Sequence, residues 1–539
     1  MKSTRAVALI ISAWAISGLG WGVTQAAAPN QRNSFKEWCL QQASLSADAR
    51  ITVEVLLAEA GTNDCELAAK KLLSLTKIYL IQKGISDLNP LSELTNLEEL
   101  YLGSNRIADV SPIKGFTKLK KLDLNDNQIA DVHLLAEVKN LESLSLDRNK
   151  IVDIRPLAEL TNLKSLGLYN NQITDVKPLA GLKNLNWLDL DNNPIADISP
   201  LSGLTNLTGL DLKGNQITDI SPLSGLTNLT NLDLEGNQIR DISPIAELTN
   251  LTKLYLEDNQ IADISPLAKL IKLTTLDLTF NQIRDVSSLA RFSNLTWLNL
   301  QFNQIRDVSP LAGLKKLEQL YLEDNQIKDV SPLAGLTNLK QLDLPFNQIR
   351  DVSSLAGLTN LKRLNLESNQ VDVSSLAGLK NVDSLNLNNN QITNISSLAG
   401  LTNLTGLNLE GNQITDISSL AGLTNLTGLN LEGNQITDVS LLEKLTNLKF
   451  LDLEGNQIKD VSPLAGMTNL INLDLEGNQV KDVRPLAGLK SLMVLNLRFN
   501  PVADISPLAA LTKLSDLHLA ENSIARQNCP ARRPDICQF

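Results

Sequence analysis

One alternation of apolar and polar residues recurs over most of the chain, from residue 75 to residue 519. Its clearest copy is Leu407–Ile417, in which leucines at every second place are followed by an asparagine and then by spaced isoleucines. The asparagine returns every 22 residues over 105–369 and again over 390–522, in the context Leu-x-x-Leu-x-Leu-x-x-Asn. A fixed period of this length predicts a solenoid of stacked coils.

Each copy predicts one short strand and one compact return segment. In an extended chain Leu407 and Leu409 point to one side while the residues between and after them point to the other. The apolar residues of 414–420 lie on a return path too short for a long helix, and Ser309-Pro310-Leu311 is typical of a tight turn.

No coil can bury its leucines alone, so the coils must stack and their strands must form one long parallel sheet. About 21 coils at roughly 4.8 Å per strand give an arc on the order of 100 Å. The repeated asparagine offers an amide donor and acceptor to backbone groups that turn away from water, so we expect a ladder that ties each coil to its neighbour. Lys83 occupies this place in the first unit.

The repeat resembles a known family. Residues 215–229, Asn-Gln-Ile-Thr-Asp-Ile-Ser-Pro-Leu-Ser-Gly-Leu-Thr-Asn-Leu, are similar to the 22-residue leucine-rich repeats of bacterial internalin-type proteins, and the match covers more than four fifths of the chain. The resemblance implies an α/β solenoid, a right-handed superhelix with a long parallel concave β-sheet and short 3-10 or turn segments on the convex side. It also implies non-enzymatic binding of a protein or peptide partner on the concave face.

The chain divides into four predicted regions. Residues 1–28 carry early basic residues, an apolar run and small residues at the exit, which favours a secretory signal peptide over a retained membrane anchor. Residues 29–74 are expected to form a helical N-terminal cap, residues 75–522 the solenoid, and residues 523–539 a C-terminal cap. The protein is therefore expected in a secreted or periplasmic, cell-envelope location, without a membrane span after signal removal.

All four cysteines lie in the terminal regions. In an exported protein this distribution favours two local disulfides, Cys39–Cys65 and Cys529–Cys537, that hold the ends of the solenoid. Free structural cysteines are the alternative. A zinc site is disfavoured because the pairs lie at opposite ends and have no histidine nearby, and we predict no metal or cofactor.

The formal charge of −11 opposes generic binding to nucleic acid or anionic membrane, and loss of Lys2 and Arg5 with the leader would leave −13. Function should therefore reside in outward strand positions, because inward positions are committed to the core. Aromatic residues at such positions are useful interface anchors, and they predict a partner-binding centre against the alternative of scattered surface aromatics. These residues are Tyr169, Trp187, Tyr255, Trp297 and Tyr321.

The coils of 401–475 are more uniform and carry adjacent carboxylates. This acidic stripe would favour a basic partner or cations, and its alternative is a solubilising face produced by repeat duplication. It supports a second functional hypothesis, a structural or adhesive envelope component that binds polysaccharide or calcium. The acidic stripe consists of Glu410, Glu432, Asp452, Glu454, Asp474 and Glu476.

Two irregularities carry structural expectations. The spacing from Asn369 to Asn390 is 21 residues, and the missing residue falls outside the strand, so we expect a local kink without a break in the sheet. A phenylalanine precedes the ladder asparagine in four coils, and we expect these rings to form a partly buried rim against neighbouring coils. They are Phe280, Phe302, Phe346 and Phe499.

The sequence does not favour an enzyme. His133 and His518 are the two histidines, and they lie in coils too far apart to share a site. Motifs of zinc proteases, phosphate-binding loops and nucleophile elbows are absent from the sequence. Outward carboxylates are abundant, but nothing in the pattern places them in a pocket that would shift their pKa values.

Overall fold

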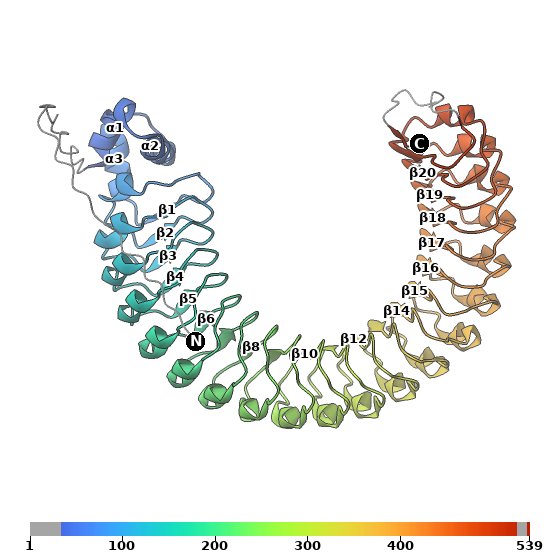
Figure 1. Cartoon of the computed structure of the whole chain (residues 1–539), viewed down its shortest axis with the longest axis horizontal. Coiled ribbons are helices and arrows are strands. Elements are labelled where there is room, and N and C mark those ends of the chain that lie inside the picture. The colour runs from blue at the N-terminus through green and yellow to red at the C-terminus, as the bar shows by residue number, and fades with distance from the viewer. Residues whose placement is uncertain (1–33, 525–535, 539) are drawn as a thin grey trace, which may run out of the picture.

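A curved sheet forms the inner face of the molecule. The computed structural model describes residues 34–524 and 536–538, and over these residues three α-helices precede a sheet of 22 parallel strands. Each strand pairs with the next one along the chain, and the stack bends into a horseshoe with strands inside and 3-10 helices outside (Figure 1). The predicted fold class, a solenoid with a long concave parallel sheet, is confirmed.

The α-helices are α1 (Phe35–Leu40), α2 (Ala47–Ala60) and α3 (Cys65–Leu73). The strands are β1 (Lys77–Tyr79), β2 (Glu99–Tyr101), β3 (Lys121–Asp123), β4 (Ser143–Ser145), β5 (Ser165–Gly167), β6 (Trp187–Asp189), β7 (Gly209–Asp211), β8 (Asn231–Asp233), β9 (Lys253–Tyr255), β10 (Thr275–Asp277), β11 (Trp297–Asn299), β12 (Gln319–Tyr321), β13 (Gln341–Asp343), β14 (Arg363–Asn365), β15 (Ser384–Asn386), β16 (Gly406–Asn408), β17 (Gly428–Asn430), β18 (Phe450–Asp452), β19 (Asn472–Asp474), β20 (Val494–Asn496), β21 (Asp516–His518) and β22 (Cys537–Gln538).

The coil that begins with β11 shows why the sequence folds this way. Leu298 and Leu300 are fully buried on the core side, because alternate residues of a strand face opposite sides. The chain then turns outward and returns through the 3-10 helix η12 (Ser309–Gly313), which has a proline in its first turn. The Asp307 carboxylate accepts a hydrogen bond from the Ser309 backbone N–H at 2.8 Å and so fixes the start of this helix.

The predicted asparagine ladder is present. The Asn303 Oδ1 atom accepts a hydrogen bond from the Ile283 N–H of the preceding coil at 3.0 Å. Its Nδ2 group donates to the Leu278 carbonyl of that coil at 2.9 Å and to the Leu300 carbonyl of its own coil at 3.2 Å. The amide therefore satisfies buried backbone groups and joins two coils at the same time. In the first unit, the Lys83 backbone N–H donates to Asn105 Oδ1 at 3.0 Å.

The short coil does not interrupt the sheet. β14 pairs with β15 in register, with Leu364 opposite Leu385. The deletion is absorbed on the outer side by the 3-10 helix η15 (Val373–Gly378), where the Asp372 carboxylate accepts a hydrogen bond from the Ser374 N–H at 3.0 Å. Continuity of the strands agrees with the loss of one residue outside the strand.

The expectation of a partly buried phenylalanine rim is wrong for three of its four rings. Phe280 and Phe346 are each 48% exposed, and Phe499 is exposed to a similar extent. All four phenylalanines have φ between 52° and 53°, in the left-handed region that bulky residues rarely adopt. Glycine, asparagine, aspartate and serine occupy the same place in other coils, so the position is a left-handed turn and its side chain points away from the core. One part of the expectation holds, since Phe280 stacks on Phe302 of the next coil at 4.1 Å.

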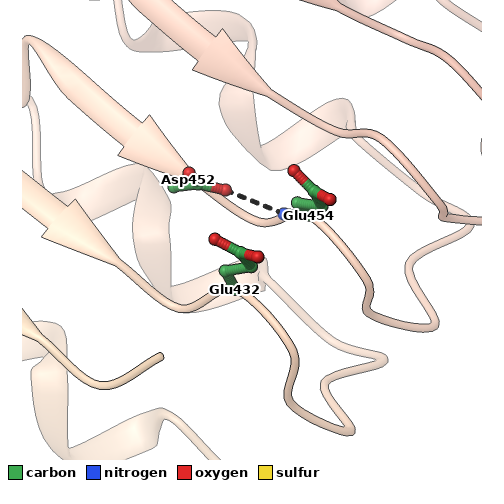
Figure 2. Close-up of side chains that lie close together, drawn as sticks. All are labelled: Glu432, Asp452 and Glu454. Atoms are coloured by element: carbon green, nitrogen blue, oxygen red, sulfur yellow. Dashed lines mark hydrogen bonds between the residues drawn. The ribbon is translucent and has the colours of Figure 1, made fainter. Parts of the chain in front are cut away.

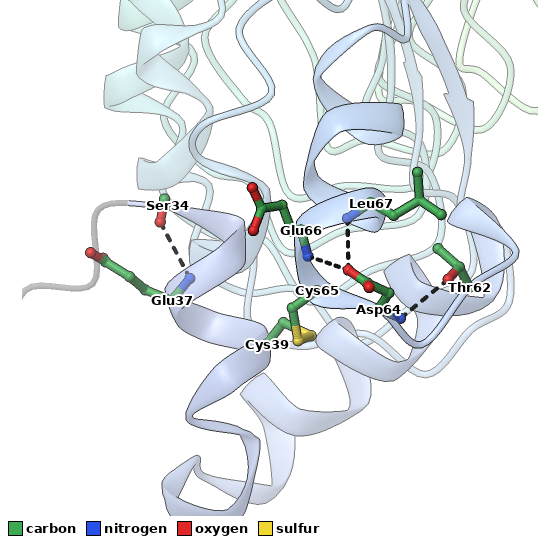
Figure 3. Close-up of a disulfide and its surroundings, with 8 residues drawn as sticks. All are labelled: Ser34, Glu37, Cys39, Thr62, Asp64, Cys65, Glu66 and Leu67. Carbon is green, nitrogen blue, oxygen red and sulfur yellow. Dashed lines mark hydrogen bonds between the residues drawn. A yellow bond between two sulfur atoms is a disulfide. The ribbon is translucent and has the colours of Figure 1, made fainter.

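The three α-helices cover the first coil. Asp64 begins α3 by accepting hydrogen bonds from the N–H groups of Glu66 and Leu67, and Cys39 of α1 forms a disulfide with Cys65 of α3 (Figure 3). The hydroxyl of Thr52 in α2 donates to the Asp87 carbonyl at 2.7 Å, which joins the helices to the solenoid. Apolar residues of the helices are continuous with the core of the coils.

At the other end, β22 pairs in parallel with β21 and extends the sheet by one short strand. Cys537 of β22 is disulfide-bonded, and its expected partner Cys529 lies outside the described residues. The expected signal peptide of 1–28 also lies outside them. The boundaries of the four regions stay predictions.

Candidate binding face

The concave sheet presents three columns of outward side chains. The first column is the residue before the first core leucine of a strand, the second lies between the two core leucines, and the third follows the second leucine. In the coil of β11 these are Trp297, Asn299 and Gln301. Because neighbouring strands pair in register, residues of one column stand side by side, as Trp297 does with Gln319. The face is therefore a grid in which each coil contributes three side chains.

The five predicted aromatic residues all lie on this grid, but in different columns. Trp187 and Trp297 belong to the first column, Tyr255 and Tyr321 to the second, and Tyr169 to the third. The Trp297 and Tyr321 rings, from adjacent strands, lie 5.7 Å apart at an angle of 51°. Both are half-buried, so part of each ring remains open to solvent. This pair is the part of the predicted centre that the fold brings into ring contact.

The other three aromatic residues stand apart from that pair. Tyr255 lies on β9, two strands before Trp297, and Trp187 lies on β6. Trp187 is 38% exposed, and its indole lies against the backbone of Gly209, where an added Cβ would come within 2.6 Å of the ring. The Arg148 guanidinium lies 5.4 Å from the centroid of Tyr169.

Sequence reasoning missed an aromatic pair at the N-terminal end of the sheet. Tyr79 and Tyr101 hold the second column of β1 and β2, and their rings stack at 4.7 Å. Lys77 Nζ lies 4.8 Å from the Tyr79 centroid and 2.7 Å from Glu99. The sequence signal that could have identified this pair was a tyrosine in the same column of two consecutive coils.

A row of half-buried aspartates was also missed. Asp189, Asp211 and Asp233 occupy the second column of β6, β7 and β8, and Asp191 stands in the third column beside them. Burial, reinforced by neighbouring carboxylates, raises the pKa of Asp189 to about 6, that of Asp211 to about 7 and that of Asp191 to about 8. The repeated triplet Leu-Asp-Leu marks the row in the sequence, but its burial depends on the curvature that only the folded sheet has.

Three residues of the predicted acidic stripe lie close together in the structure. Carboxylate oxygens of Glu432, Asp452 and Glu454 lie within 4.8 Å of one another (Figure 2). The Asp452 carboxylate accepts a hydrogen bond from the Glu454 N–H at 3.0 Å. Burial and the neighbouring carboxylates raise the pKa of Glu454 to about 7 and also raise the pKa values of Glu432 and Asp452. Three oxygen ligands at this spacing are compatible with a hard divalent cation.

A groove of about 570 Å³ runs along the concave face from β15 to β20. Gly406 and Gly428 hold the first column of β16 and β17, so the sheet carries no side chain there. Phe450 follows in the same column of β18 and is 51% exposed. Sequence reasoning treated these coils as uniform, although two consecutive glycines followed by phenylalanine were the available signal.

A family model described as leucine-rich repeats in two copies matches ten stretches that together run from residue 73 to residue 510. The chain belongs to the leucine-rich-repeat family. No curated protein matches its sequence significantly.

Solved structures of leucine-rich-repeat proteins extend this result. An internalin, InlF from Listeria monocytogenes, is 36% identical with a TM-score of 0.57, over 60% of this chain and 96% of its own. The leucine-rich-repeat protein LIC12759 of Leptospira interrogans is 28% identical with a TM-score of 0.59, over 71% of this chain and 96% of its own. The plant peptide hormone receptor RGFR1, solved in complex with RGF2, shares the fold at 22% identity and a TM-score of 0.61, over 80% of this chain and 79% of its own. The predicted internalin-type resemblance is confirmed.

The two histidines of this leucine-rich-repeat protein belong to different coils. His133 Nδ1 lies 2.8 Å from the Asp131 carboxylate on the outer side, and His518 Nε2 lies 3.3 Å from Asp516 on β21. Each imidazole therefore pairs with a carboxylate of its own coil. Across the described part of the chain, no helix is long and apolar enough to cross a membrane.

Proposed function

We propose that this leucine-rich-repeat protein is an exported, non-enzymatic scaffold that recognises a protein or peptide partner on its concave face. The observation that carries the proposal is the contact between the half-buried rings of Trp297 and Tyr321 near the middle of the grid. Rings held in one orientation by neighbouring strands lose little conformational entropy on binding, and aromatic residues dominate the energetics of many interfaces. A stable complex buries roughly 800 Å² per partner, and the concave sheet offers the outward side chains of 22 strands for such a contact.

Trp297→Ala combined with Tyr321→Ala is expected to abolish capture of the partner from envelope and extracellular extracts by the purified mature protein. The core leucines are untouched, so the variant should keep the circular dichroism spectrum and thermal unfolding midpoint of the parent. Phe346→Ala is the matched control, because it removes an exposed ring from the next coil without altering the strand face. Equal recovery of the same protein by parent and double variant would reject the aromatic centre.

Export is supported by the leader pattern of 1–28 and by the disulfide between Cys39 and Cys65 in the helical cap. N-terminal sequencing of the protein recovered from its native cell is expected to begin after residue 28. A chain that still starts at Met1 would contradict signal removal and favour a retained anchor.

The acidic stripe supports a second candidate function, a structural or adhesive component that binds polysaccharide or calcium. Its specific support is the close approach of the Glu432, Asp452 and Glu454 carboxylates. Recovery of only calcium-dependent polysaccharide by both parent and double variant, sensitive to Glu432→Gln with Glu454→Gln, would place this function ahead of protein recognition.

A further inference from the structure

The groove from β15 to β20 is shaped by the absence of two side chains. An added Cβ at Gly428 would meet no atom within 4 Å, and one at Gly406 would meet only the Ser384 hydroxyl, at 3.8 Å. Gly428 stands directly opposite Phe450 in the sheet register. The phenylalanine therefore has open space on the side of β17, in agreement with its 51% exposure. An exposed aromatic ring beside a position without a side chain leaves space for a planar group to stack on the ring.

The groove is acidic at the end that contains the ring. Asp452 and Asp474 line it, and Glu432 and Glu454 stand in the adjoining column. Glu476, in the third column of the coil that follows Phe450, has a cationic neighbour, Arg498, at 3.6 Å. Mutual repulsion contributes to the raised pKa values of Glu432 and Glu454, so a cation entering the groove would relieve it.

Phe450 and Asp452 combine these two properties. They are residues i and i+2 of one strand, so both side chains stand on the concave face about 7 Å apart. A planar cation stacked on the ring within the roughly 6 Å reach of a cation–π contact can direct its N–H groups at the carboxylate. Guanidinium meets both requirements, whereas an ammonium is a compact point charge and does not stack. A calcium ion would use the carboxylates but would leave the ring and the glycine floor without a role.

We propose that this groove binds an arginine side chain presented by an extended polypeptide segment of the partner, with the guanidinium between Phe450 and Asp452 and the aliphatic stem over Gly406 and Gly428. The inference rests on the proposed function in one respect, that the concave face is the binding face. It adds the location of a second anchor point, six to seven strands from Trp297, and the chemistry that the partner must carry there.

Isothermal titration of the full mature protein with defined peptides tests the inference without knowledge of the partner. The probes are acetyl-(Gly-Arg)3-amide, its lysine and citrulline analogues, and free arginine amide. The parent is expected to bind the arginine peptide at least 10-fold more tightly than the citrulline peptide or arginine amide, and at least 3-fold more tightly than the lysine peptide. Phe450→Ala and Gly428→Val should each weaken that binding at least 10-fold.

Gly466→Ala is the matched control, because Gly466 lies on the outer 3-10 helix η19 (Ser462–Gly466) and also has open space around it. It should bind the arginine peptide as the parent does. Equal affinities for arginine and citrulline peptides, or undiminished binding by folded Gly428→Val and Phe450→Ala, would overturn the inference. If arginine amide bound as tightly as the arginine peptide, the groove would recognise a small cation and the proposed polypeptide segment would be rejected. None of these results depends on Trp297 or Tyr321, so the groove and the proposed aromatic centre can fail separately.

Discussion

Replacing Asn303 with alanine is expected to lower the free energy of unfolding of the central coils by about 3 to 5 kcal/mol, because it removes buried hydrogen bonds in two coils at once. The Ile283 N–H and the Leu278 carbonyl of the preceding coil would lose their amide partner. Each buried polar group left unpaired costs about 1 to 3 kcal/mol. Asn303 is only 9% exposed, so water cannot readily replace its amide.

Urea denaturation and amide hydrogen exchange measure this effect. Because each coil contacts mainly its neighbours, protection should fall first in the coils of β10, β11 and β12 and much less at the ends of the solenoid. Gln304→Ala is the control, since the adjacent Gln304 makes a surface hydrogen bond with Arg284 and faces away from the ladder. A loss for Asn303→Ala no larger than that for Gln304→Ala would show that the ladder contributes little to stability.

The ladder also illustrates what the sequence can predict. The period of 22 residues and the alternation of leucines require stacking, and the amide of each repeated asparagine has few other roles in such a stack. These constraints act between neighbouring residues or repeat at a fixed spacing, so they can be recognised from the sequence alone. The start of α3 at Asp64 is held by the same kind of local constraint, because a capping side chain and its target N–H groups are neighbours in sequence.

The groove, the half-buried aspartates and the exposed phenylalanines could be recognised only in the structure. The glycine at 428 is unremarkable by itself, and its meaning depends on Phe450 standing opposite it one coil later. Phe346 belongs to the phenylalanines that were expected to form a partly buried rim, but a φ of 53° turns its side chain away from the core. Asp191 is one of many outward carboxylates in the sequence, and the burial that raises its pKa becomes visible only in the folded sheet.

The half-buried aspartates lead to the second large expected effect, a loss of stability as the pH rises. The folded chain holds protons on Asp189, Asp211 and Asp191 up to pH values of about 6, 7 and 8, whereas the ordinary aspartate pKa is 3.8. Between the ordinary pKa and the raised pKa of each aspartate, the folded state binds more protons than the unfolded state. The free energy of unfolding must therefore decrease with increasing pH in this range. We expect a loss of about 1 kcal/mol per group between pH 5 and pH 8, after allowance for solvent screening.

At acid pH, protonation of other carboxylates lowers the free energy of unfolding. Asp153 and Asp482 pair with neighbouring arginines, and the side-chain hydrogen bonds lower the pKa of each carboxylate to about 2. Their contribution is present above the ordinary pKa and is lost as the pH falls toward 2. Both of these aspartates lie on the exposed outer side, where ion pairs contribute little. The maximum of stability should therefore lie near pH 4, about the ordinary pKa of an aspartate, below the range usual for proteins.

Urea midpoints measured from pH 4 to pH 9 check this expectation. Asp191→Asn combined with Asp211→Asn should flatten the decline above pH 5, because an amide carries no charge that burial can penalise. Asp219→Asn, at an exposed carboxylate on the outer turn of the same coil as Asp211, should leave the decline unchanged. A parent protein whose midpoint is constant or rises between pH 5 and pH 8 would show that the concave carboxylates are better solvated than their burial indicates. Since Asp189 and Asp211 lie on the same pair of strands as Trp187, the same titration would change the charge of the concave face on which we propose that a partner binds.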